Sequence, residues 1–140
     1  MALRILLVDD EPHSREHLAA LLEEHPGVTV AGSVSGGAEA AAFLRRTAVD
    51  LLFLDIEMED VSGFDLARHI QFAYPKVLIV FLTGHVDFAL DGYEFKPLAF
   101  LIKPVNPLRL ERVLFQAEEL LGKTERKASS SVRIGLQVNG

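Results

Sequence analysis

Five polar side chains stand out because each lies at or just after the end of a short apolar run. They are Asp9, Asp10, Asp55, Thr83 and Lys103. Clustered carboxylates repel one another unless a cation lies between them, and oxygen ligands without His or Cys suit Mg²⁺. An aspartate can accept a phosphoryl group, and a metal, an ammonium and a hydroxyl can neutralise the phosphoryl oxygens. The set therefore predicts a Mg²⁺-assisted phosphoryl site, provided that the fold brings the five residues together.

Each of these residues also has a simpler explanation when it is taken alone. Adjacent acids after a strand often cap the next helix, and Asp55 at the end of an apolar run has the same alternative. Thr83 and Gly84 can form a simple turn, and Lys103 can lie in a solvated loop. Four separate strand ends that each carry a needed group favour a common site over these local explanations.

The elements that must position these residues are five predicted strands separated by helical patterns. The strands are Leu3–Val8, Val28–Ser33, Leu51–Leu54, Val77–Leu82 and Ala99–Ile102. The first, third and fourth are almost continuously apolar, as in a parallel sheet that helices cover on both faces. The alternation indicates βαβ units, in five β–α repeats that end near Leu121. Ligands bind at the carboxyl ends of such strands, where the polar residues are expected.

Two of the predicted helices have clear start signals. Ser62 is expected to cap one helix, with Asp65 three residues later in a capping box. Asn106 is expected to cap the last helix, with Pro107 at its first position. The side chains expected to face inward are Phe64, Ala67, Ile70 and Phe72 in the first of these helices, and Leu110, Val113, Leu114, Ala117, Leu120 and Leu121 in the second.

The overall composition is that of one globular domain. The chain has 140 residues, 49% of them hydrophobic and 24% charged, which excludes extensive disorder. Its net charge of −6 disfavours direct binding to the phosphate backbone of a nucleic acid. The absence of cysteine excludes disulfides and thiolate metal sites. No apolar run is long enough to span a bilayer, and the N-terminus does not resemble a signal peptide, so we expect a cytoplasmic protein with no membrane partner.

The composition changes after the last predicted helix. Residues 122–131 are polar and contain basic residues and serines, which indicates a linker. Residues 132–140 alternate like a strand, and one strand cannot fold alone. We therefore expect a domain at 1–121, a linker at 122–131 and the start of a second, truncated domain at 132–140. The alternative is a strand that packs onto the first domain.

Five stretches together resemble the receiver domain of response regulators, from bacterial two-component signalling. They are ILLVDDE at 5–11, LLFLDIEM at 51–58, Gly63, VFLTG at 80–84 and FLIKP at 100–104. The resemblance covers nearly the whole predicted domain. It implies an α/β fold of the flavodoxin-like class, a (βα)₅ doubly wound sandwich with a five-stranded parallel sheet in the order 2-1-3-4-5.

The resemblance also implies a metal site and a phosphoacceptor. Asp55 corresponds to the phosphoacceptor, and Asp10 and Asp55 to direct ligands of Mg²⁺. Asp9 would act on the metal through water. The backbone carbonyl of Glu57 would complete the protein ligands.

Three further positions would sense the phosphoryl group. Thr83 corresponds to a hydroxyl that bonds a phosphoryl oxygen, and Lys103 to an ammonium that pairs with it. Phe100 occupies the position of an aromatic switch, which turns when Thr83 moves inward. The peptide bond between Lys103 and Pro104 would be cis, as is usual in the family.

Two departures from the family pattern lie beside the site. Glu59 stands where a proline commonly follows Met58, and we expect this change to loosen the loop after Asp55. Gly84 replaces a frequent alanine beside Thr83, which still leaves room for a phosphoryl group. Neither departure removes a group that phosphoryl transfer needs.

A finer resemblance concerns the output domain that the receiver would control. HVDFALDGYEFKPLAFLIKP at 85–104 is similar to receivers that precede LytTR-type DNA-binding domains, and VRIGLQVNG at 132–140 is similar to the opening strand of such a domain. The implied partners are a histidine kinase or phosphotransfer protein and a second copy of the chain. Dimerisation would use the helix before Ala99–Ile102, that strand and the final helix. DNA would be bound only by the missing output domain.

The expected function is a phosphorylation-activated switch that catalyses only its own phosphoryl transfer and dephosphorylation. Two alternatives remain open. A Mg²⁺-dependent aspartyl phosphohydrolase usually has a second Asp two residues after its nucleophile, where this chain has Glu57. A receiver-like module that works without phosphorylation would typically lack one acid or the lysine.

Overall fold

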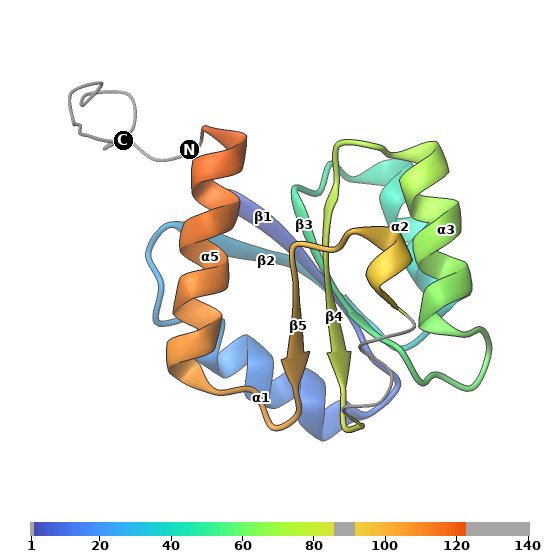
Figure 1. Ribbon diagram of the computed structural model, residues 1–140, viewed down its shortest axis with the longest axis horizontal. Coiled ribbons are helices and arrows are strands. Elements are labelled where there is room, and N and C mark those ends of the chain that lie inside the picture. Colours follow the sequence, from blue (N-terminus) through green and yellow to red (C-terminus); the bar gives the residue numbers. More distant parts are fainter. Residues whose placement is uncertain (1, 86–91, 123–140) are drawn as a thin grey trace.

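The computed structural model describes residues 2–85 and 92–122 (Figure 1). In chain order the elements are β1 (Leu3–Val8), α1 (Pro12–Leu22), β2 (Val28–Val34), α2 (Gly37–Arg46), β3 (Leu51–Asp55), α3 (Gly63–Ala73), β4 (Leu78–Thr83), the short 3₁₀ helix η1 (Tyr93–Phe95), β5 (Ala99–Ile102) and α5 (Pro107–Leu121). The helix expected before β5 falls largely on residues 86–91, outside the described residues. The same is true of nearly all of the linker and of the strand expected at 132–140.

The five strands form one parallel sheet in the order β2-β1-β3-β4-β5, which confirms the predicted fold class and strand order. Figure 1 shows α1 and α5 on one face of the sheet and α2 and α3 on the other. Because the strands are parallel, their carboxyl ends all lie at the same end of the sheet, toward which the arrows of β4 and β5 point in Figure 1.

The continuously apolar strands supply a separate hydrophobic core to each face of the sheet. Ile5 and Leu7 of β1 pack with the buried residues of α1 and α5. Leu6 and Val8 of the same strand pack with α2 and α3. Because successive side chains of a strand point to opposite faces, a strand covered on both sides must be apolar at every position.

The strand ends differ from the expected ones by one residue in three cases. β2 ends at Val34 rather than Ser33, β3 includes Asp55, and β4 runs from Leu78 to Thr83. Asp55 and Thr83 are thus the last residues of their strands. Their backbones are held in the sheet, which fixes the direction in which each side chain leaves it.

Both predicted helix caps are present. The hydroxyl oxygen of Ser62 accepts hydrogen bonds from the backbone N–H groups of Phe64 and Asp65 at 3.1 and 3.4 Å. The side-chain oxygen of Asn106 accepts from those of Leu108 and Arg109 at 2.9 and 3.2 Å. These bonds satisfy amide groups that have no partner within the helix.

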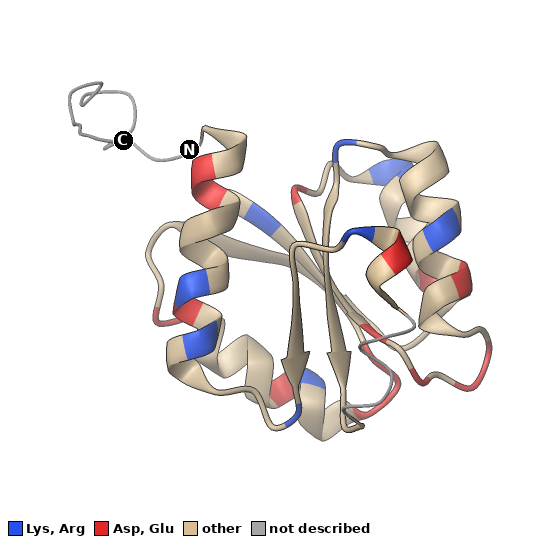
Figure 2. Cartoon of the chain, in the orientation of Figure 1, with Lys and Arg blue, Asp and Glu red and all other residues tan. Residues whose placement is uncertain are grey.

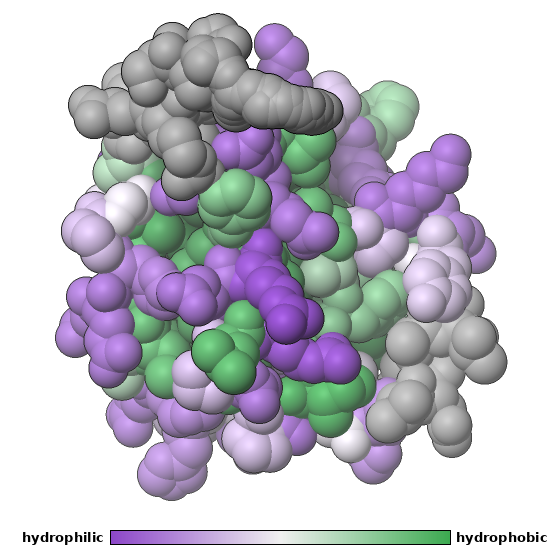
Figure 3. Space-filling model, turned by 60° about the vertical axis from the view of Figure 1, so that its left-hand side comes forward, coloured by the Kyte–Doolittle hydropathy of each residue, from purple (hydrophilic) through white to green (hydrophobic). Residues whose placement is uncertain are grey.

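Two side chains expected to face inward are exposed instead. Phe72 is 90% exposed and Leu120 is 66% exposed. Phe72 follows Ile70 by two positions, which places it about 200° away around α3. Leu120 lies in the last turn of α5, at the margin of the apolar stripe. The side of the molecule that carries α5 accordingly shows apolar patches separated by hydrophilic ones (Figure 3).

The described residues include no helix that has both the length and the apolar character needed to cross a bilayer.

Candidate functional site: an acidic cluster at the carboxyl end of the sheet

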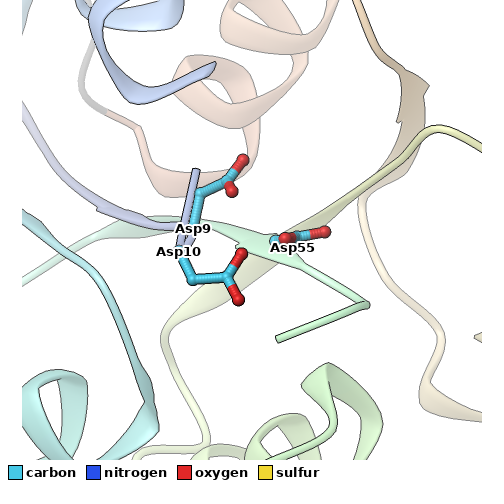
Figure 4. A group of neighbouring side chains, drawn as sticks. All are labelled: Asp9, Asp10 and Asp55. Carbon is cyan, nitrogen blue, oxygen red and sulfur yellow. The ribbon is translucent and has the colours of Figure 1, made fainter. Parts of the chain in front are cut away.

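The ends of β1 and β3 bring three carboxylates together, as the sequence predicts. β1 and β3 are neighbours in the sheet, so Asp9 and Asp10 lie beside Asp55. One carboxylate oxygen from each of the three residues lies within 4.8 Å of the others (Figure 4). Asp9 and Asp55 are buried, whereas Asp10 is half-buried at the rim. Acidic segments gather around this edge of the sheet (Figure 2).

Lys103 reaches this cluster from the loop after β5. Its Nζ lies 3.0 Å from Oδ2 of Asp9 and 3.6 Å from Oδ1 of Asp55. The carboxylate of Glu11 is 3.4 Å away on the solvent side. Burial by itself would lower the pKa of Lys103, but its contacts with these three carboxylates raise that pKa overall. The peptide bond that joins Lys103 to Pro104 is cis.

The proton affinity of Asp55 is set by opposing neighbours. Burial, reinforced by the negative charge of Asp9, raises the pKa of Asp55 to about 7. The ammonium of Lys103 and a hydrogen bond from the backbone N–H of Glu57, at 3.1 Å, act in the opposite direction. A nearby divalent cation would favour the ionised carboxylate. The site is therefore one that gains from binding a cation.

The loop after Asp55 closes one side of the site. The backbone N–H of Glu59 donates a hydrogen bond to Oδ2 of Asp10 at 3.1 Å. Asp10, Glu11, Asp55, Glu57, Glu59 and Lys103 line an open hollow of about 430 Å³. The loop thus makes a backbone hydrogen bond to Asp10 at Glu59, the position where proline is common in the family.

The Thr83 hydroxyl and the Phe100 ring contact residues outside the acidic cluster. The Thr83 hydroxyl is fully buried, accepts a hydrogen bond from the backbone N–H of His85 at 2.9 Å and donates one to its carbonyl at 3.1 Å. The ring of Phe100 stacks on Phe81 and meets Tyr93 edge-on, with centroid distances of 5.4 and 5.5 Å. The hydroxyl would have to turn to reach a group on Asp55.

Three residues that border the site make contacts that were not predicted from the sequence. Glu11 pairs with Lys103, and its place directly after Asp9 and Asp10 was the available signal. Asp60 accepts hydrogen bonds from the backbone N–H groups of Gly37 and Ala38 at the start of α2. Nothing local to Asp60 indicates this contact, because its partners lie more than 20 residues away. His85 Nε2 lies 3.5 Å from a carboxylate oxygen of Glu57 at the mouth of the hollow.

Comparison with known proteins agrees with this geometry. Residues 5–115 match the family described as response regulator receiver domain. The sensory transduction protein LytT of Enterococcus faecalis is 33% identical over 140 residues, covering 96% of this chain and 58% of that protein. The transcriptional regulatory protein BtsR of Escherichia coli is 31% identical over 123 residues, covering 88% and 51%. The chain thus spans about half the length of these relatives.

Solved receiver structures have the same fold. The response regulatory domain of mrkE from Klebsiella pneumoniae superposes with a TM-score of 0.79 at 26% identity, covering 87% of this chain and 100% of that one. The receiver domain of the response regulator AraT from Geobacillus stearothermophilus gives 0.80 at 27% identity, covering 88% and 98%. Since the family match spans most of the chain and the acidic cluster lies where the fold binds ligands, the chain belongs to the response regulator receiver domains and is similar to those of LytTR-type regulators.

Proposed function

We propose that this chain is a phosphorylation-activated switch whose phosphoacceptor is Asp55. The observation that carries the proposal is the position of the Asp55 carboxylate. It is buried between the carboxylates of Asp9 and Asp10 and the ammonium of Lys103, yet it lines a hollow open to solvent. A phosphodonor can enter that hollow, and the ammonium of Lys103, which would offset phosphoryl charge, lies 3.6 Å from Asp55.

The donor set suits Mg²⁺ as the cofactor. Its side-chain ligands would all be carboxylate oxygens, which hard divalent cations prefer, and their mutual repulsion is relieved by a dication. Asp10 and Asp55 would hold the metal directly with the backbone carbonyl of Glu57, and Asp9 through water. When bound, the ion would neutralise charge on the transferred phosphoryl oxygens.

The transfer needs little movement of the protein. An oxygen of ionised Asp55 attacks the phosphorus of phosphohistidine on a histidine kinase or phosphotransfer protein. A new O–P bond forms while the P–N bond breaks, and the electron pair leaves with the imidazole. Lys103, already 3.6 Å from Asp55, would pair with a phosphoryl oxygen. The chain would catalyse only this transfer and the later hydrolysis of its own phosphoryl group.

The signal would pass through Thr83 and Phe100. The Thr83 hydroxyl would exchange its bonds with His85 for one with the phosphoryl group, and Phe100 would turn into the space that is vacated. This is a shift between two packings of one fold. The face around η1, β5 and α5, together with the segment before η1, would then bind a second copy of the chain.

The output would lie beyond the receiver. The matched regions make up 58% of LytT and 51% of BtsR, which supports an output domain after the receiver. In this proposal residues 122–131 form a linker and the output domain begins at 132–140. We propose a LytTR-like domain that binds DNA and regulates transcription. A cytoplasmic location for the kinase-facing receiver is part of the same proposal.

The first experiment is the intact mass of the protein after incubation with acetyl phosphate, with and without Mg²⁺. We expect one phosphoryl adduct that needs Mg²⁺ and is absent from Asp55→Asn. Continuous release of inorganic phosphate from small phosphate esters would favour the phosphohydrolase alternative. Absence of an adduct, together with failure to bind beryllofluoride, would contradict the proposal and favour a module that works without phosphorylation.

A further inference from the structure

The loop between β3 and α3 is tied to the acidic cluster by its own backbone. The N–H of Glu59 donates to Oδ2 of Asp10 at 3.1 Å, across 49 residues of sequence. Two residues earlier, the N–H of Glu57 donates to Oδ1 of Asp55 at 3.1 Å. Two of the three clustered carboxylates therefore each accept a hydrogen bond from this loop (Figure 4 shows the three carboxylates).

The group that contacts Asp10 is the amide of residue 59 and not its side chain. Any residue with a backbone N–H can make this bond, but proline cannot, because its nitrogen carries no hydrogen. The glutamate found where proline is common in this family therefore has a specific consequence here. It supplies one more donor to a carboxylate at the rim of the cluster.

Neighbouring contacts keep this amide in place. Asp60 accepts hydrogen bonds from Gly37 at 2.9 Å and from Ala38 at 3.3 Å, and so caps α2, whose N-cap Gly36 has no side chain. These contacts lower the pKa of Asp60 and keep it charged. The loop is thus fixed on both sides of Glu59, to Asp55 and to α2, so the amide of Glu59 cannot easily move away from Asp10.

We propose that the backbone amide of Glu59 is a positioning group for the metal site. It holds the Asp10 carboxylate beside Asp55 against the repulsion of the neighbouring acids, and it anchors the loop that carries the Glu57 carbonyl. This inference rests on the proposed function, because it takes Asp10 as a ligand of the divalent cation. Hydrogen-bond partners of metal ligands typically change metal affinity by about 10- to 100-fold when they are removed.

Metal binding by the full 140-residue chain tests the proposal. Calorimetric titration with MgCl₂ and MnCl₂ compares the unsubstituted protein, Glu59→Pro and Glu59→Gln. Glu59→Gln removes the charge and keeps the N–H, whereas Glu59→Pro removes both. We expect Glu59→Pro to bind about tenfold more weakly than Glu59→Gln. Equal affinities of the two variants would overturn the role given to the amide.

The same titration separates this inference from the proposed function. If the unsubstituted protein binds neither ion, the metal step of the proposed function fails, and the positioning role fails with it. If it binds and the two variants bind equally, only the positioning role fails.

A second measurement does not depend on whether Glu59→Pro folds. Amide hydrogen exchange is followed by NMR in the metal-free protein and in Asp10→Ala. We expect the Glu59 amide to be protected in the first and to exchange about tenfold faster in the second, because its acceptor is lost. The Gly37 amide, which Asp60 holds, is the internal control and should not change. An unprotected Glu59 amide, or one that stays protected in Asp10→Ala, would overturn the proposal.

Discussion

At the scale of single residues, the site contains one largely buried ammonium, that of Lys103, beside two buried carboxylates, those of Asp9 and Asp55. Asp9 is paired with Lys103 at 3.0 Å, while Asp55 lies farther from the same ammonium, at 3.6 Å, and keeps a raised pKa. In the absence of a divalent cation, the charge of Asp55 is therefore the one that the fold accommodates least well.

The raised pKa of Asp55 predicts a pH-dependent effect of Asp55→Asn. The carboxyl titrates near 7 in the folded protein and near 3.8 in the unfolded one. Between pH 3.8 and pH 7, folding is therefore accompanied by protonation of Asp55. The stability that this protonation provides is lost as the pH rises toward 7. Asparagine is neutral at every pH. Asp55→Asn should therefore raise the free energy of unfolding more at pH 8 than at pH 5, and the two increases should differ by at most about 2–3 kcal/mol. Thermal unfolding in EDTA at both pH values measures it. An equal gain at both would contradict the predicted titration.

The pairing of Lys103 predicts a loss of stability in Lys103→Met. Removing the ammonium leaves the buried carboxylate of Asp9 without its 3.0 Å partner. We expect a loss of about 2–3 kcal/mol in urea unfolding at pH 8 without metal, and partial recovery with Mg²⁺. Lys76→Met, at an exposed position away from the cluster, is the matched control. If both variants lose the same stability, the ion pair is not the cause.

At the scale of elements, the position of Asp55 depends on the close approach of the first residue of α3, Gly63, to the end of β3. The N–H of Gly63 donates to the carbonyl of Ile56 at 2.8 Å. A Cβ atom at Gly63 would lie 2.3 Å from the carbonyl oxygen of Asp55 and 2.7 Å from Cα of Ile56. Both are backbone atoms, so no side chain can move aside to make room.

Gly63→Ala is therefore expected to push the end of β3 and displace Asp55. The loss of stability should be about 2 kcal/mol or more, with a slower gain of the phosphoryl adduct. Gly84→Ala is the matched control, because a Cβ at Gly84 meets no atom within 4 Å. Urea unfolding and intact mass measure the two effects. Equal behaviour of the two variants would show that the close approach at Gly63 is not required.

At the scale of the whole molecule, a cluster of aromatic rings connects α3 to β5, the outermost strand on that side of the sheet. Phe81 of β4 contacts Phe64, Phe95 and Phe100, with centroid distances between 5.3 and 5.8 Å. Tyr93 lies edge-on to Phe100 and is 63% exposed. A change in the position of Phe100 would therefore reach the surface through Tyr93.

This arrangement predicts that Tyr93 contributes to dimerisation of the activated protein. We expect beryllofluoride with Mg²⁺ to convert the protein to a dimer in sedimentation velocity, and Tyr93→Ala to weaken that dimer by about tenfold or more. Phe72→Ala is the matched control, since Phe72 is also exposed but lies on α3. Intact mass checks that both variants still take up the phosphoryl group. A dimer unaffected by Tyr93→Ala would place the interface elsewhere.

Much of the architecture could be predicted from the sequence because its causes are local. Continuous apolar runs indicate strands covered on both faces, and the caps Ser62 and Asn106 bond amides only two and three residues away. In a parallel sheet all strands end at one edge, so Asp10, Asp55 and Lys103 could be expected at one site from their places after the strands.

Contacts between loops were decided at the level of tertiary structure. The capping of α2 by Asp60 and the bond from the amide of Glu59 to Asp10 depend on where segments that are far apart in the sequence meet in three dimensions. Backbone amides also leave no trace in residue type, except where proline removes one. The order of residues thus indicates which chemical groups reach the carboxyl edge of the sheet, whereas packing between elements decides how each group is held there.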